Sequence, residues 1–164
     1  MKYKVLTLWQ PWALLLAGGE KLIETRPSPT QWTIEKGTYL IHAAKKMDNW
    51  LFDLARTEPF KTSLSDIFNR TRMVMQFGAI IGAIEVKECC EIFHVENNTA
   101  AIKRELGGFT DWVTKKEFLF GNYEKGRYAW LCQNPRILKT PIPYKNGQGY
   151  YQNFKGDESQ LIFL

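Results

Sequence analysis

The hydrophobic and polar positions of the chain first predict a strand and then a short buried helix. Residues 3–8 are apolar and β-prone, and residues 12–17 form a run that is apolar on every side. A helix without a polar face is a buried helix. Pro11 before this run and Gly18-Gly19 after it are typical start and stop signals. The sequence therefore predicts a strand that leads directly into a short core helix.

Further along, strand-like and helix-like patterns follow one another irregularly. We predict strands over residues 20–26, 38–44, 78–86 with a continuation to 93, 127–133, 137–143, 150–154 and 160–164. Helical spacing predicts helices over residues 47–58 and 63–77, while residues 97–106 and 111–118 look helical or irregular. Because helices do not alternate regularly with strands, a small mixed α+β barrel fits better than a doubly wound sheet.

Composition supports one globular domain over residues 1–164. The chain has 45% hydrophobic and 24% charged residues, with no repeat and no linker-like stretch. No apolar run approaches the roughly 20 residues of a membrane helix, and no secretory signal is visible, so we expect a cytoplasmic protein without a membrane partner. The three cysteines have neither disulfide nor zinc spacing. We therefore expect no metal site and no cofactor.

The net charge of the chain indicates what kind of partner to expect. The formal net charge is +5 and the isoelectric point is about 9.1. An excess of cations favours a polyanionic partner such as nucleic acid.

Several segments carry a family resemblance. They are residues 6–13, which read Leu-Thr-Leu-Trp-Gln-Pro-Trp-Ala, residues 19–26, which read Gly-Glu-Lys-Leu-Ile-Glu-Thr-Arg, and residues 37–46 and 78–86, with 128–131 downstream. In this order they resemble the ASCH domain (activating signal cointegrator homology) of the PUA-like superfamily. The resemblance implies a five- or six-stranded β-barrel, a helix after the first strand, a cleft beside that helix and a role with nucleic acid.

The segment after the double glycine supplies charged candidates. In a strand over residues 20–26, Glu24 and Arg26 lie on one face, where a carboxylate and a guanidinium can orient a base edge. Lys21 would point to the other face. If all three line one cleft, as the resemblance implies, Lys21 must precede the strand or a bulge must intervene. The alternative is a surface strand with solvated charges.

Aromatic and basic residues complete the predicted binding set. Indoles stack on bases, although either tryptophan can instead belong to the core, and we expect Gln10 to face the cleft. His42 is either a binding residue or a hydrogen-bonded residue of the barrel. Lys45 and Lys46 either contact phosphate or lie in a solvated loop. The set is Trp9, Gln10, Pro11, Trp12, Lys21, Glu24, Arg26, His42, Lys45 and Lys46.

An enzyme is the main alternative. Some ASCH relatives are similar to amidohydrolases that deacetylate N4-acetylcytidine, and another type has been described as a ribonuclease. Glu85 lies in an apolar strand and matches the place of a glutamate that acts with the lysine in the amidohydrolase branch. That branch has a threonine where this chain has Glu24. An enzyme would use Lys21, Glu24 and Glu85, but without the hydroxyl nucleophile.

The partner that we expect is RNA, single-stranded DNA or a nucleoside-like small molecule. A protein-interaction module on the same barrel is a third hypothesis. Exposed aromatics near Tyr150-Tyr151 leave the chain as a monomer or a weak homodimer.

Overall fold

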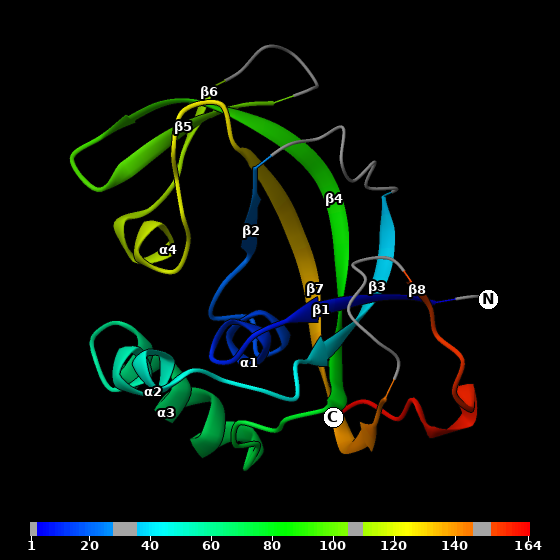
Figure 1. The fold of residues 1–164 in the computed structure, drawn as a ribbon. Coiled ribbons are helices and arrows are strands. Elements are labelled where there is room, and N and C mark those ends of the chain that lie inside the picture. Colours follow the sequence, from blue (N-terminus) through cyan, green and yellow to red (C-terminus); the bar gives the residue numbers. More distant parts are fainter. Residues whose placement is uncertain (1–2, 28–35, 105–109, 146–151) are drawn as a thin grey trace. The chain divides into compact units, whose positions relative to one another are not determined.

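The computed structural model describes residues 3–27, 36–104, 110–145 and 152–164 (Figure 1). They belong to two compact units. The first unit comprises Met1–Glu20, Thr38–Ile84 and Asn134–Leu164, and the second unit comprises Lys21–Gly37 and Glu85–Gln133. A single domain over residues 1–164 stays a prediction.

The described strands form a mixed sheet. They are β1 (Lys4–Leu8), β2 (Ile23–Arg26), β3 (Gly37–Ala43), β4 (Ala79–Glu96), β5 (Thr99–Lys103), β6 (Thr110–Trp112), β7 (Tyr128–Pro143) and β8 (Gln152–Asn153). Their order is β2-β7-β4-β3-β1-β8, with β5 paired to β4 and to β6. The α+β class is therefore confirmed. Since this order ends at β2 and at β8 among the described residues, closure into a PUA-like β-barrel stays a prediction.

Four α-helices accompany the described strands. They are α1 (Trp12–Ala17), α2 (Asn49–Ala55), α3 (Phe60–Thr71) and α4 (Lys115–Leu119), and a 3-10 turn covers Glu158–Gln160. The first three helices belong to the first unit, and α4 belongs to the second. Among the described residues, no helix has both the length and the apolar character that crossing a membrane requires.

The first unit is built around β1 and the buried helix α1. β1 pairs in parallel with β3, with Val5 opposite Leu40, and both residues lie in the core of this unit. α1 is buried as predicted, and a Cβ atom on Gly18 would lie 2.4 Å from Ile67 Cδ1 of α3. Arg70 of α3 donates to the Gly18 carbonyl oxygen at 2.7 Å. An arginine thus satisfies one of the carbonyls that a helix leaves open at its end.

The second unit has a core of its own, which includes Ile92, Ile102 and Ala129. The prediction that residues 97–106 are helical or irregular is wrong for residues 99–103, which form β5 directly after β4. Asn97 and Asn98 have φ values of 48° and 59°. Two consecutive left-handed residues make the turn that joins antiparallel strands tightly, and asparagine tolerates this conformation.

Other predicted boundaries also need correction. β7 runs through Asn134 and Pro135, where we expected the strand to end, because Asn134 takes a left-handed φ of 51° within the strand. One such residue bends a strand in the manner of a bulge instead of terminating it. β2 begins at Ile23 and not at Glu20, and α3 begins after Pro59 instead of at Ser63 or Ser65.

The two strands predicted near the C-terminus are shorter in the structure than expected. β8 covers Gln152–Asn153, and residues 160–164 contribute a bridge between Phe163 and Leu138 in place of a full strand. Tyr150 and Tyr151 lie outside the described residues.

Close packing at Gly82 gives the first prediction. A Cβ atom at this position would lie 2.3 Å from the carbonyl oxygen of Arg136 and 2.9 Å from the Cβ atom of Ala17. Because a backbone atom cannot move aside cheaply, Gly82→Ala should lower the free energy of unfolding by about 2–3 kcal/mol in urea denaturation. Lys139→Ala, at an exposed position of β7, should stay within about 0.5 kcal/mol. Equal stability of the two variants would contradict the packing.

Candidate functional site

The second unit buries a lysine side chain among oxygen atoms. Lys21 is 1% exposed and lies before β2, as the sequence analysis requires if it shares a site with Glu24. Its ammonium donates to the carbonyl oxygen of Ile23. Its Nζ atom lies 3.3 Å from Glu24 Oε2 and 3.9 Å from Glu117 Oε1. Burial of an unpaired charge is costly, so these oxygens are what allow the ammonium to lie inside the protein.

Glu117 reaches this lysine from α4. Its backbone N–H donates to the hydroxyl of Thr114, the residue that caps the helix, and its carboxylate accepts from the N–H groups of Leu22 at 2.9 Å and Ile23 at 3.1 Å. The carboxylate therefore holds the start of β2 through its backbone. Burial raises the pKa of Glu117, while the Lys21 ammonium and the two N–H groups act in the opposite direction.

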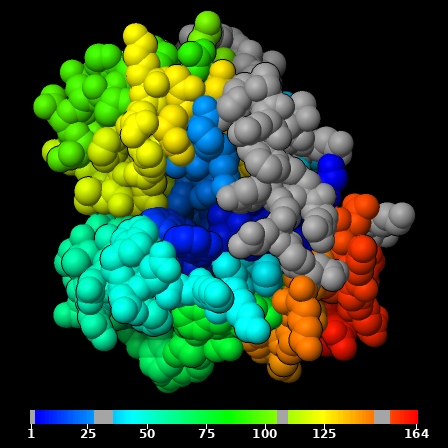
Figure 2. Space-filling model, viewed as in Figure 1, coloured from blue at the N-terminus to red at the C-terminus, as the bar shows by residue number. Residues whose placement is uncertain are grey.

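Arg26 continues the same charged face along β2. Its Nη2 atom lies 3.0 Å from Glu24 Oε1, and its guanidinium carbon lies 5.5 Å from the centre of the Trp130 ring. β2 and β7 are antiparallel, with Glu24 opposite Trp130. Glu24 and Arg26, which we expected on one face of the strand, form an ion pair, so both Glu24 oxygens lie beside a cation. In Figure 2 the medium-blue residues of β2 reach the visible face beside the yellow residues around α4.

Two more polar side chains of the second unit lie close to these carboxylates. Burial, followed by Glu117 and Glu24, raises the pKa of Tyr123. Burial also raises the pKa of Cys132 to about 12, so its sulfur stays a thiol at neutral pH. No group of three His, Cys, Asp or Glu side chains in the described part of the chain is arranged to hold a metal ion.

The sequence analysis missed Glu117 and Tyr123. Thr114 and Glu117 have the spacing of a capping box, a motif in which the glutamate turns back to its own helix start. This motif signals the beginning of α4, but Glu117 instead bonds backbone groups about 95 positions earlier. No local pattern reports such a contact.

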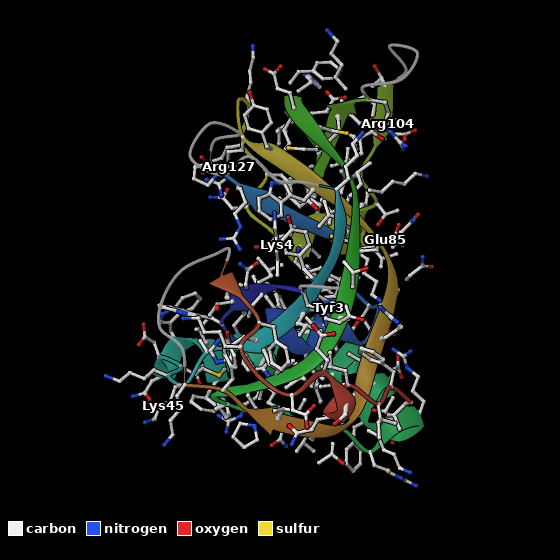
Figure 3. All side chains as sticks on the ribbon, turned by 90° about the vertical axis from the view of Figure 1, so that its right-hand side faces the viewer. Tyr3, Lys4, Lys45, Glu85, Arg104 and Arg127 are labelled. Atoms are coloured by element: carbon white, nitrogen blue, oxygen red, sulfur yellow. The ribbon has the colours of Figure 1, made fainter. Side chains whose placement is uncertain are left out.

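Glu85 has a hydrogen-bond partner within the second unit. It lies on β4 (Figure 3), and its Oε1 atom accepts a hydrogen bond from Gln133 Nε2 at 3.0 Å. The carboxylates paired with Lys21 in the described part of the chain are those of Glu24 and Glu117. Lys21 and Glu24, two of the three predicted catalytic residues, are thus paired in the structure, with Glu117 beside them, and a catalytic role stays a prediction.

The first unit holds the other predicted site residues, and it buries two of the polar ones. Gln10 is fully buried, contrary to the expectation that it faces a cleft: its Nε2 donates to the Gln76 carbonyl at 2.9 Å, and its Oε1 accepts from Leu14 N at 3.1 Å. The amide thereby satisfies a free N–H of the first turn of α1. His42 is buried, with Nδ1 3.1 Å from Thr7 Oγ1, and burial lowers its pKa.

The remaining candidates of the first unit differ in exposure. Pro11 is buried and Trp12 is partly buried, whereas Trp9 is 48% exposed. Lys45 and Lys46 follow β3 and are exposed, with Lys45 labelled in Figure 3. Of these five residues, Trp9 and the two lysines are thus the ones whose side chains are well exposed.

Comparison with known families agrees with this arrangement. Residues 6–142 match the ASCH domain, and the chain therefore belongs to the ASCH domain family. This PUA-like family is usually linked to RNA binding.

The raised pKa of Glu117 gives a pH-dependent prediction. A carboxyl group whose pKa is raised by folding stabilises the protein fully below its ordinary value of 4.5, and this contribution is lost as the pH rises through the folded-state pKa. Urea unfolding of the wild type and of Glu117→Gln should therefore show a stability difference that shifts in favour of the variant as the pH rises. One titrating proton changes it by at most about 1.4 kcal/mol per pH unit. A difference that is constant between about pH 4 and pH 8 would contradict the burial of an ionisable carboxyl at this position.

Proposed function

We propose that this ASCH domain binds nucleic acid, either RNA or another single strand, and that Arg26 contacts the ligand. The observation that carries this proposal is the fixed guanidinium of Arg26, which is paired with Glu24 and lies over the Trp130 ring. A guanidinium presents five N–H donors in a planar fork that matches phosphate oxygens and the acceptor edge of a guanine. Holding it in place before binding reduces the entropy lost when the ligand arrives.

Lys21 has a supporting role in this proposal. Its buried ammonium is surrounded by protein oxygens, so it does not act as a mobile phosphate contact. It holds one oxygen of Glu24, and the other oxygen of Glu24 orients Arg26. Lys21, Glu24 and Arg26 thus act as a buried anchor, a bridging carboxylate and a guanidinium whose side chain is 12% exposed.

The predicted binding residues of the first unit divide in the same way. Trp9, Lys45 and Lys46 are exposed and would contact bases or phosphates directly. Gln10, Pro11 and His42 are buried and would act by fixing the backbone that carries these contacts. Trp12 is partly buried and is therefore intermediate between these two groups.

The proposal predicts a specific loss on substitution of Arg26. Arg26→Ala should raise the dissociation constant for a labelled single-stranded RNA by about 10-fold, because a hydrogen-bonded charge is removed, when measured by fluorescence anisotropy. Lys125→Ala removes one exposed positive charge of the same unit and should change it by less than about 2-fold. For the wild type, affinity should fall as salt rises. Equal affinity of both variants, or no binding by the wild type at low salt, would overturn the proposal.

A hydrolase that acts on a modified nucleoside or on RNA is the second candidate. It is favoured by the raised pKa of Glu117, since a carboxyl group that keeps its proton to higher pH beside a lysine suits acid–base chemistry. Deacetylation of N4-acetylcytidine would add water across the amide to give cytidine and acetate. Glu85 would serve only if it left Gln133, its hydrogen-bond partner at 3.0 Å.

This candidate predicts turnover that depends on the buried lysine. Incubation with N4-acetylcytidine, and separately with RNA, should release acetate or cleaved strands, and Lys21→Met should abolish either product. Lys125→Ala, with the same loss of charge at an exposed position, should keep the rate of the wild type. If high concentrations of the wild type convert neither substrate, the hydrolase is excluded and the binding proposal stands.

A further inference from the structure

Two prolines lie inside a strand near the end of the chain. β7 runs to Pro143 and also contains Pro141. A proline has no N–H group, so it removes a hydrogen bond from the ladder of a sheet unless its nitrogen faces away from the neighbouring strand. The direction of the backbone groups at these two positions therefore decides what the prolines do.

A hydrogen bond just after the second proline shows which side of β7 is already paired. The N–H of Tyr144 donates to the carbonyl oxygen of Gly78, the residue before β4, at 2.8 Å. In a strand, the N–H and C=O groups of every second residue point to the same side. The even-numbered residues over 138–144 therefore turn their backbone groups towards β4, a neighbour of β7 in the sheet.

The C-terminal segment reaches the other side of β7. The N–H of Lys139 donates to the carbonyl oxygen of Ile162 at 2.8 Å, and Leu138 forms the bridge to Phe163 (Figure 1). Odd-numbered residues of this stretch therefore turn their backbone groups away from β4. Both prolines are odd-numbered, so their nitrogens point to this outer edge and the ladder with β4 loses no hydrogen bond.

Over residues 139–143 this outer edge offers acceptors and no free donor. The N–H of Lys139 is taken by the Ile162 carbonyl, and neither proline has one. Within the described part of the chain, β2 pairs with β7 at residues 128–131, so no strand covers the prolines. A strand that adds to an edge uses both its donors and its acceptors, and here the donors are missing.

Apolar side chains beside this edge would favour association. A groove of about 380 Å³ is lined by residues 139–143 together with Gln160 and Ile162. Ile162 is 59% exposed and Leu164 is 64% exposed. An open edge with apolar side chains next to it is a template for pairing with another chain, so this edge needs a means of protection.

The outer edge of β2 is closed by a different device. The N–H of Cys132 in β7 donates to the Leu22 carbonyl, so the next residue, Ile23, turns its own N–H and C=O groups to the outside. Glu117 Oε1 accepts a hydrogen bond from that N–H at 3.1 Å, and the Lys21 ammonium donates to that carbonyl oxygen. Two side chains thus take the place of a neighbouring strand at β2, whereas β7 has the prolines.

We propose that Pro141 and Pro143 keep this chain from pairing with a second copy of itself, by closing the outer edge of β7 to strand addition. With an N–H group at both positions, two copies would pair antiparallel, with residue 141 of one copy opposite residue 143 of the other. Such a contact uses the same edge on both copies and is closed by a two-fold axis. The inference is independent of the proposed function, because it does not involve Arg26 or a nucleic acid.

Sedimentation velocity of the double variant Pro141→Thr/Pro143→Thr tests the proposal. Threonine favours strands and restores an N–H group at both edge positions. The weight-average mass of the variant should rise with protein concentration, towards about 2-fold that of the wild type. Each single variant supplies half of the new donors, so its dimer should dissociate at concentrations about 10-fold higher or more.

Lys139→Thr is the matched control for this measurement. It places the same strand-favouring residue on the same edge and removes a charge, but the N–H at this position is already bonded to the Ile162 carbonyl. Its mass should therefore equal that of the wild type at every concentration. Pro141→Lys/Pro143→Lys restores the N–H groups together with cations that repel each other across the pair, so it should associate less than the threonine variant.

The far-UV circular dichroism spectrum of each variant at low concentration should match that of the wild type. If the double variant loses this spectrum, the two single variants decide the question. The proposal fails if the mass of the folded threonine variants does not change with concentration, or if Lys139→Thr associates as strongly as they do. It also fails if the wild type itself associates as strongly as the double variant, because the prolines then close nothing.

Discussion

A buried ammonium group must be surrounded by oxygen atoms, and in this protein that requirement organises the second unit. Lys21 lies among the Ile23 carbonyl and the carboxylates of Glu24 and Glu117. Glu117 in turn accepts hydrogen bonds from the backbone N–H groups of Leu22 and Ile23 at the start of β2. Glu24 positions Arg26. Removing any one of these partners would leave a charge or an N–H unsatisfied in a desolvated place, which is why the local geometry has few alternatives.

The excess of positive charge and the fixed guanidinium of Arg26 belong to different units of the chain. The charged cluster of the second unit contains two cations and two carboxylates, and the unit as a whole is neutral, so it contributes orientation and little long-range attraction. The first unit has the excess of cations, with 12 lysines and arginines against 7 aspartates and glutamates. Net charge sets how fast and how generally a polyanion is captured, whereas a fixed guanidinium fork discriminates among acceptors.

The sequence predicted what periodicity and family motifs encode, and it missed contacts between distant segments. The buried helix α1, the long strand β4 and the pairing of Glu24 with Arg26 follow from local patterns. The Asn97-Asn98 turn was missed because two adjacent left-handed asparagines are a weaker signal than asparagine followed by glycine. The contacts of Glu117 depend on which segments meet in space.

The chemistry of the cluster favours binding over nucleophilic catalysis. Both oxygens of Glu24 lie within 3.3 Å of a cation, so this carboxylate is already engaged by Lys21 and Arg26. The Thr25 hydroxyl accepts a hydrogen bond from Asn122 N at 3.2 Å, which draws electron density away from its oxygen. Cys132 keeps its proton at neutral pH. The carboxylate of Glu24 pairs with both Lys21 and Arg26, which holds the guanidinium in place, and a fixed guanidinium suits recognition of a phosphate or base edge.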